Sequence, residues 1–257
     1  MDFDLILTFM AGAAIAAAAG VLGVFAVMKR MALAGDVLSH VAFPGVALAL
    51  TFSFSPSLGA ALFLFGAAYA IWAVRTRTKL PEETVIGVFF VSALAVGALL
   101  FAGHEEEVLE TLFGGIETLP PFAAVVAIIA ALLLIILMVF ATRRLVLSVV
   151  SPELAASAKI KTDVAELLFL LAFAAGVLLG YRFAGTLLMG ALIIVPAATA
   201  QNMSSSLRSF LVLSAGIAVI ATITGLVLGS YFSIPPGPPI ILVSVGLFAL
   251  SLAWRRA

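Results

Sequence analysis

Cysteine is absent from this chain of 257 residues, and charged side chains are scarce. Without cysteine there is no disulfide, no thiolate metal site and no cysteine nucleophile. Charged residues make up 10% of the sequence, whereas soluble domains carry roughly 25%. Hydrophobic residues make up 64% of it, and they lie in runs long enough for transmembrane helices. The formal net charge is zero, so the composition gives no reason to expect nucleic-acid binding.

Sequence motifs for nucleotide binding and for hydrolytic catalysis are also missing. The chain contains no GxxxxGK[ST] phosphate loop, and neither GxSxG nor HExxH occurs. We therefore expect no enzymatic activity, and in particular no ATP hydrolysis, from this chain by itself. The start, Met1-Asp2-Phe3-Asp4, is acidic and lacks the basic region of a cleavable signal peptide. The first apolar run is accordingly expected to be a retained span.

The apolar runs predict an all-α, polytopic membrane helix bundle with eight or nine transmembrane helices, forming one domain over residues 1–257. The second run is the weakest because it carries charge, and the sixth and seventh are nearly continuous through Tyr181-Arg182-Phe183. If the second, sixth or seventh run is a re-entrant segment that does not cross the membrane, the chain has eight spans. The candidate spans are about 5–28, 36–54, 58–74, 84–102, 122–142, 164–181, 184–200, 210–232 and 239–254.

Basic residues orient the nine-span arrangement. If Lys29 and Arg30 are cytoplasmic, all of the 13 lysine and arginine residues except Arg182 fall on the cytoplasmic side. Acidic residues gather on the other side, in the segment His104-Glu105-Glu106-Glu107, which we interpret as a solvated loop. The pattern predicts a multi-pass protein of the cell membrane, with its N-terminus outside and its C-terminus in the cytoplasm.

Small residues at helical spacing predict close helix packing. Gly176 and Gly180 are spaced GxxxG, and so are Gly225 and Gly229. Such faces let helices approach closely in lipid, where apolar burial alone gives little drive for association. They favour a packed bundle and an oligomer.

One stretch, residues 35–45, places a carboxylate and an imidazole four residues apart. On a helix, Asp36 and His40 would share one face, and their oxygen and nitrogen atoms suit a divalent transition metal. An aspartate at mid-membrane depth costs about 2.5–3.5 kcal/mol on insertion scales, so it is rarely idle. The alternative is that Asp36 lies at the cytoplasmic headgroups and caps the second helix. The spacing alone leaves both interpretations open.

Between the fifth and sixth spans, a serine followed by proline and glutamate is typical of a helix start. The pattern predicts a short cytoplasmic helix between two spans, at which a soluble partner could push. This segment consists of Ser151, Pro152, Glu153, Leu154, Ala155, Ala156, Ser157, Ala158 and Lys159.

Several of these stretches, taken in order, resemble one family: the membrane permease subunits of ATP-binding-cassette importers for manganese, zinc or iron(II). Besides the short cytoplasmic segment, the similar stretches are GDVLSH followed by PG (35–45), PEETVIG (81–87), GTLLMGALIIVPAATA (185–200), and GLVLGSY (225–231) with PGP (236–238). The resemblance extends over nearly the whole chain. Serine stands at 151 and 233, where the family usually has aspartate, and Lys159 replaces a usual glycine.

The resemblance implies that Asp36 and His40 contact the metal ion on its path across the membrane. It implies that 151–159 is the coupling helix that docks on an ATPase subunit. The expected partners are a second copy of the chain in a homodimer, cytoplasmic ATP-binding subunits, an extracytoplasmic metal-binding protein and membrane lipid. No permanently bound cofactor is expected, because the divalent ion is the transported substrate.

Other functions stay open at this point. An ATP-independent secondary metal transporter would need ionisable residues in several spans, and beyond Asp36 this chain offers little except Glu166. A permease for iron chelates or cobalamin would share a related helical architecture but would need no Asp/His pair. A non-transporting membrane scaffold would need neither ionisable residues in its spans nor an Asp/His pair. The residues do not choose among zinc, manganese and iron(II), since a nitrogen-plus-oxygen site suits all three.

Overall fold

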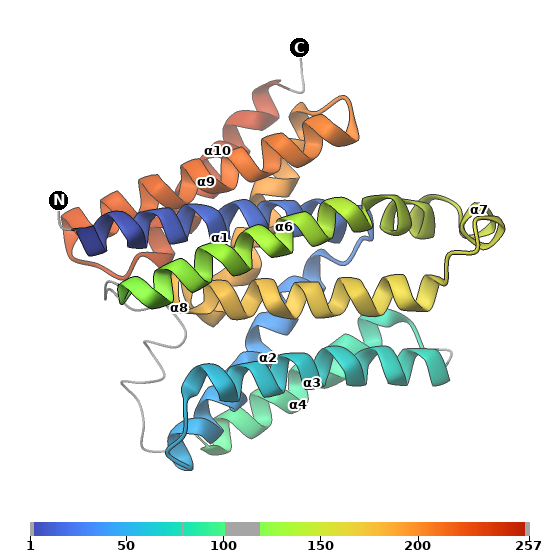
Figure 1. Cartoon of the computed structure of the whole chain (residues 1–257), viewed down its shortest axis with the longest axis horizontal. Coiled ribbons are helices and arrows are strands. Elements are labelled where there is room, and N and C mark those ends of the chain that lie inside the picture. The colour runs from blue at the N-terminus through green and yellow to red at the C-terminus, as the bar shows by residue number, and fades with distance from the viewer. Residues whose placement is uncertain (1–2, 79, 101–118, 255–257) are drawn as a thin grey trace.

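The structure, a computed structural model, describes residues 3–78, 80–100 and 119–254, without the side chains of 32–36, 82, 152, 182–184 and 186–188. Every regular element in these ranges is an α-helix (Figure 1). The helices are α1 (Phe3–Met28), α2 (Ala32–Thr51), α3 (Pro56–Arg77), α4 (Glu82–Leu100), α6 (Pro121–Val150), α7 (Pro152–Ser157), α8 (Thr162–Met203), α9 (Leu207–Phe232) and α10 (Gly237–Trp254).

The outer surface of the bundle is apolar, as a lipid environment requires. Phe122 and Phe140 on α6 are both 82% exposed. Six helices in the described ranges are long and apolar enough to cross a membrane; they lie in α1, α3, α4, α6, the first part of α8 and α9. Shorter apolar helices lie at Val37–Thr51, Met189–Met203 and Gly237–Ala253. The all-α membrane bundle is confirmed, and the number of spans stays a prediction.

The helices form two groups that α8 joins (Figure 1). In one group, α2 packs against α3 and α4. In the other, α1 packs against α6 and α9, and α10 lies against α9. Because α8 contacts α2 and α3 as well as α1, α6, α9 and α10, it connects the group that carries Asp36 and His40 to the rest of the bundle.

Small residues let these helices approach closely. A Cβ atom on Gly20 of α1 would lie 2.6 Å from the carbonyl oxygen of Ser214 on α9. The Ser214 hydroxyl in turn donates a hydrogen bond of 2.7 Å to the carbonyl oxygen of Gly20. Gly225 of α9 is equally close to the backbone of Ile240 on α10. The packing role that the sequence predicts for Gly225 is therefore confirmed within the chain.

The sixth and seventh predicted spans are merged in α8, which bends at Gly185. This glycine has φ 76° and ψ 162°, a backbone conformation that side chains rarely allow. The sequence places the junction at Tyr181-Arg182-Phe183, so the observed bend lies two residues beyond the predicted junction. Polar residues mark the start of the junction, but backbone freedom at glycine decides where the chain turns.

Other helix ends differ from the predicted limits for a simple reason. The fifth predicted span ends at Thr142, whereas α6 continues to Val150. Arginine is a good helix former, so Arg143 and Arg144 end the apolar run without ending the helix. Likewise, α2 begins at Ala32 rather than at Asp36.

Candidate metal-binding site

Asp36 and His40 both lie on α2. The helix begins at Ala32 with Met31 at the N-cap, so Asp36 is inside the helix. The interpretation of Asp36 as an N-cap residue is therefore wrong. The backbone places residues 36 and 40 on one helical face, as the spacing predicts. The side chain of Asp36 lies outside the described part of the structure.

His40 lies in the buried interior of the bundle. His40 itself is 9% exposed, and its neighbours Leu38 and Ser39 are fully buried. The imidazole ring lies 5.3 Å from the ring of Phe90 on α4, centroid to centroid, with the planes tilted by 56°. Within this chain, α4 thus covers one side of the histidine.

Directly beyond His40, α2 passes through Pro44 without a break in the helix. Pro44 and Gly45 therefore do not interrupt the second span. Proline has no N–H, so it does not donate the usual helical hydrogen bond to the carbonyl of His40 four residues earlier. Gly45 then meets Gly59 of α3 backbone to backbone. A Cβ atom on either glycine would overlap the carbonyl oxygen of the other. The contacts of His40 with Phe90 and of Gly45 with Gly59 pack α2 against α4 and α3 near the candidate site.

The described side chains of the single chain include no cluster of three or more histidine, cysteine or acidic groups that could hold a metal ion. The segment His104-Glu105-Glu106-Glu107 lies outside the described residues. A complete coordination shell would therefore need ligands beyond the described side chains of this chain.

The short helix predicted near residue 151 is present as α7. The Ser151 hydroxyl accepts a hydrogen bond of 3.2 Å from the amide of Leu154, and Pro152 occupies the first helical position. The helix ends at Ser157, and Lys159 turns the chain with φ 55°. The predicted helix start is confirmed, and it is the serine that provides the cap where the family usually has aspartate.

An ion pair between a partly exposed arginine and a buried glutamate is a feature that sequence reasoning did not assign. Arg75 near the end of α3 pairs with Glu166 near the start of α8. The signal in the sequence is Glu166, a carboxylate inside a predicted span, but the sequence does not reveal its partner.

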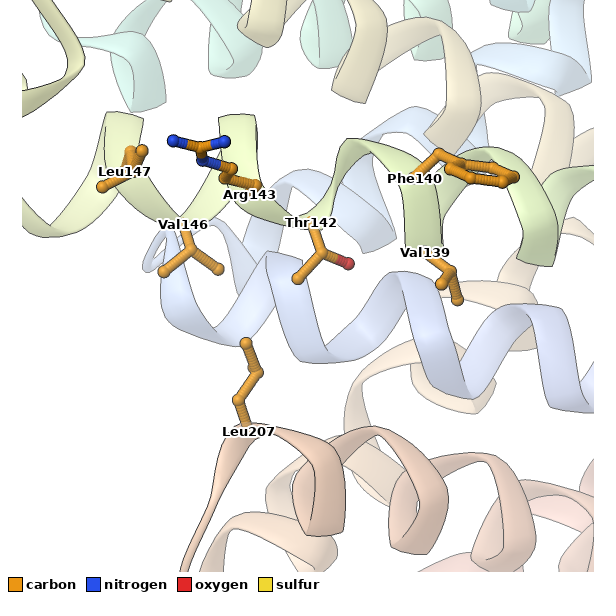
Figure 2. A pocket seen from close by; sticks show the side chains of 7 residues that line it. All are labelled: Val139, Phe140, Thr142, Arg143, Val146, Leu147 and Leu207. Carbon is orange, nitrogen blue, oxygen red and sulfur yellow. The ribbon is translucent and has the colours of Figure 1, made fainter. Parts of the chain in front are cut away.

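Elsewhere, a cavity of about 590 Å³ opens between α6 and α9. Figure 2 shows Thr142 and Val146 of α6 on the side facing Leu207, while the Arg143 side chain extends away from this gap. Neither His40 nor α7 contributes to its lining. This cavity is thus separate from the candidate metal site.

A bundle of long apolar helices with an apolar outer surface is the architecture of a polytopic membrane protein. Residues 2–255 match the family described as the ABC 3 transport family. The chain belongs to this family, which confirms the resemblance seen in the sequence.

Relatives match most of the chain. The manganese import system permease protein ScaB of Streptococcus parasanguinis is 31% identical over 240 residues, which cover 93% of this chain and 86% of ScaB. The high-affinity zinc uptake system membrane protein ZnuB of Haemophilus influenzae is 27% identical over 238 residues, which cover 91% of each chain.

Solved structures share the fold. A structure described as PsaBC from Streptococcus pneumoniae in complex with Fab matches with a TM-score of 0.85 and 26% identity, covering 98% of this chain and 91% of the other. An inward-facing putative metal-chelate type ABC transporter matches with a TM-score of 0.74 and 20% identity, covering 97% and 84%. At 20% identity, the match to this second structure shows a shared fold.

Proposed function

We propose that this chain is the permease subunit of an ATP-binding-cassette importer that moves a divalent transition-metal ion into the cell by alternating access. The family match over residues 2–255 carries this proposal. Manganese and zinc are the proposed substrates, because ScaB and ZnuB are named for them. Neither an ATP-independent carrier nor a scaffold accounts for membership of this family.

The proposed ion site is built from Asp36 and His40 of two copies of the chain. Support comes from their shared helical face and from the burial of His40. Two such pairs around a dimer axis supply up to four nitrogen and oxygen ligands, which suits a tetrahedral or partly hydrated ion. The ion should be held weakly, because a transport site must also release it.

The proposed docking element for the ATPase is α7. Leu154 is 59% exposed on this helix. An exposed apolar side chain on a short cytoplasmic helix suits contact with a partner protein. ATP binding and hydrolysis in that partner would move α7, while an extracytoplasmic metal-binding protein delivers the ion on the opposite side.

Nine spans with the N-terminus outside fit the arrangement of the helices. Figure 1 shows α1, α3 and α6 all ending on the side where α7 lies. Lys29, Arg75 and Arg143 therefore lie toward the same side, and this excess of basic residues supports its assignment as the cytoplasmic side. The three shorter apolar helices complete nine crossings if each spans the bilayer with local thinning.

Uptake of radioactive manganese by lipid vesicles tests this function. Vesicles containing the permease and its ATPase should accumulate the ion only when the binding protein and ATP are supplied on their respective sides. The double substitution Asp36→Ala/His40→Ala should abolish accumulation while the complex stays assembled. ATP-independent uptake would contradict the importer mechanism, and unchanged uptake by the double variant would contradict the site.

A further inference from the structure

The inner ends of α3 and α8 are tied together by two polar contacts. Arg75 of α3 pairs with Glu166 of α8. One helical turn before Arg75, the indole N–H of Trp72 donates a hydrogen bond of 2.9 Å to the backbone carbonyl of Asp163. Near the start of α3, the hydroxyl groups of Ser57 and of Tyr181, which lies in the middle of α8, share a hydrogen bond of 2.9 Å. The two helices are thus linked by polar contacts near both ends of α3.

An ion pair with a buried carboxylate is unusual in a mostly apolar helical bundle. Glu166 is only 6% exposed, and within the part of the chain that the structure describes its Oε1 atom has no hydrogen-bond partner. Burying the Glu166 carboxylate costs free energy unless the charge is paired, and its partner Arg75 is only partly buried. Ionisable groups inside membrane helices usually serve function.

The position of the ion pair relative to α7 suggests what that function is. Only residues 158–161 separate the end of α7 from the first residue of α8. Asp163 and Glu166 therefore lie in the first two turns of the helix that α7 leads into. Because α7 contacts both α6 and α8, a displacement of α7 can reach Asp163 and Glu166 through the start of α8. Their contacts would then pass it to Trp72 and Arg75 on α3.

From α3 the path continues to the candidate metal site. Gly59 of α3 touches Gly45 of α2 backbone to backbone, so the two helices are in direct contact here. Gly45 follows His40 by little more than one helical turn. At the inner end, a cavity of about 510 Å³ lined by residues that include Lys29, Arg30 and Arg75 leaves room beside the ion pair.

We propose that Arg75, Trp72 and Glu166 are positioning residues that transmit the displacement of α7 to α3 and, through the Gly45–Gly59 contact, to the helix that carries Asp36 and His40. This proposal rests on the proposed function of α7 as the docking helix. The contacts act by coupling ATP hydrolysis to ion movement, and they do not touch the ion themselves.

The number of ATP molecules hydrolysed per manganese ion transported tests the proposal, with both rates measured in the same vesicles. We expect Glu166→Gln to retain ATP hydrolysis and to raise this ratio by about twofold to thirtyfold, the range typical of residues that couple distant sites. The charge reversal Arg75→Glu/Glu166→Arg should bring the ratio back toward the wild-type value. Arg77→Gln, an exposed residue in the same last turn of α3, is the matched control and should leave it unchanged.

Trp72→Phe keeps the test decisive if Glu166→Gln does not fold. This substitution removes the N–H donor while preserving most of the aromatic ring, and it should also raise the ratio. A folded Glu166→Gln or Trp72→Phe variant with the wild-type ratio would overturn the proposal. A wild-type complex that shows no ATP-driven uptake would instead overturn the proposed function, so the two failures are distinguishable.

Discussion

A methyl group at Gly59 should disrupt the contact between α2 and α3. The Cβ atom of Gly59→Ala would overlap the carbonyl oxygen of Gly45, which belongs to the backbone of a packed helix and has no side-chain freedom to move aside. Overpacking of this kind costs about 1–3 kcal/mol, and a rigid backbone obstacle places the cost at about 2–3 kcal/mol. Alanine recovers about 0.5–1 kcal/mol through its better helix propensity. The net loss of unfolding free energy should be about 1–2.5 kcal/mol.

Gly66→Ala is the matched control, since Gly66 lies on the same helix, is exposed, and has open space within 4 Å of the position that an alanine methyl group would take. That variant should be unchanged or stabilised by up to about 1 kcal/mol. Equilibrium unfolding in mixed detergent micelles measures both variants under one condition. Equal stabilities for Gly59→Ala and Gly66→Ala would refute the backbone contact between α2 and α3.

Three further predictions concern other parts of the bundle. Gly225→Ala should destabilise the protein by about 1–3 kcal/mol in the same unfolding assay, because its Cβ would meet the backbone of Ile240. Gly216 on the same helix has open space around its Cβ position, so Gly216→Ala should not destabilise the protein. Equal effects of the two substitutions on stability would contradict the packing of α9 on α10. Gly185→Ala should cost about 1–3 kcal/mol because φ 76° and ψ 162° form a backbone conformation that is essentially restricted to glycine, and an unchanged stability would argue against the bend. Ser151→Ala should remove a cap worth about 1 kcal/mol, so that the Leu154 amide exchanges hydrogen about fivefold faster, whereas unchanged exchange would refute the cap.

The sequence predicts the helical bundle because lipid imposes a simple requirement. Each crossing needs a long apolar run, and the breaks between runs are charged or rich in turn residues. Helix ends are harder to predict, as α6 shows by extending through Arg143 and Arg144 to Val150. Hydropathy marks where the membrane ends, while helix propensity decides where the helix ends.

The candidate site is only partly predictable from the sequence. The spacing of Asp36 and His40 is sufficient to place them on one helical face, which the course of α2 confirms. The cover of His40 by Phe90 and the contact of Gly45 with Gly59 join residues far apart in the chain, and no local pattern predicts such pairs. The same is true of Arg75 and Glu166, whose pairing depends on how α3 and α8 pack.

The ion content of the purified complex tests the central claim most directly. Electron paramagnetic resonance of bound manganese, titrated in the absence of ATP, measures how many ions the complex holds per permease chain. A site shared by Asp36 and His40 of two copies predicts one ion for two chains, with the bound signal lost in Asp36→Asn and in His40→Gln. One ion per chain, or a bound signal that survives both substitutions, would contradict the shared site.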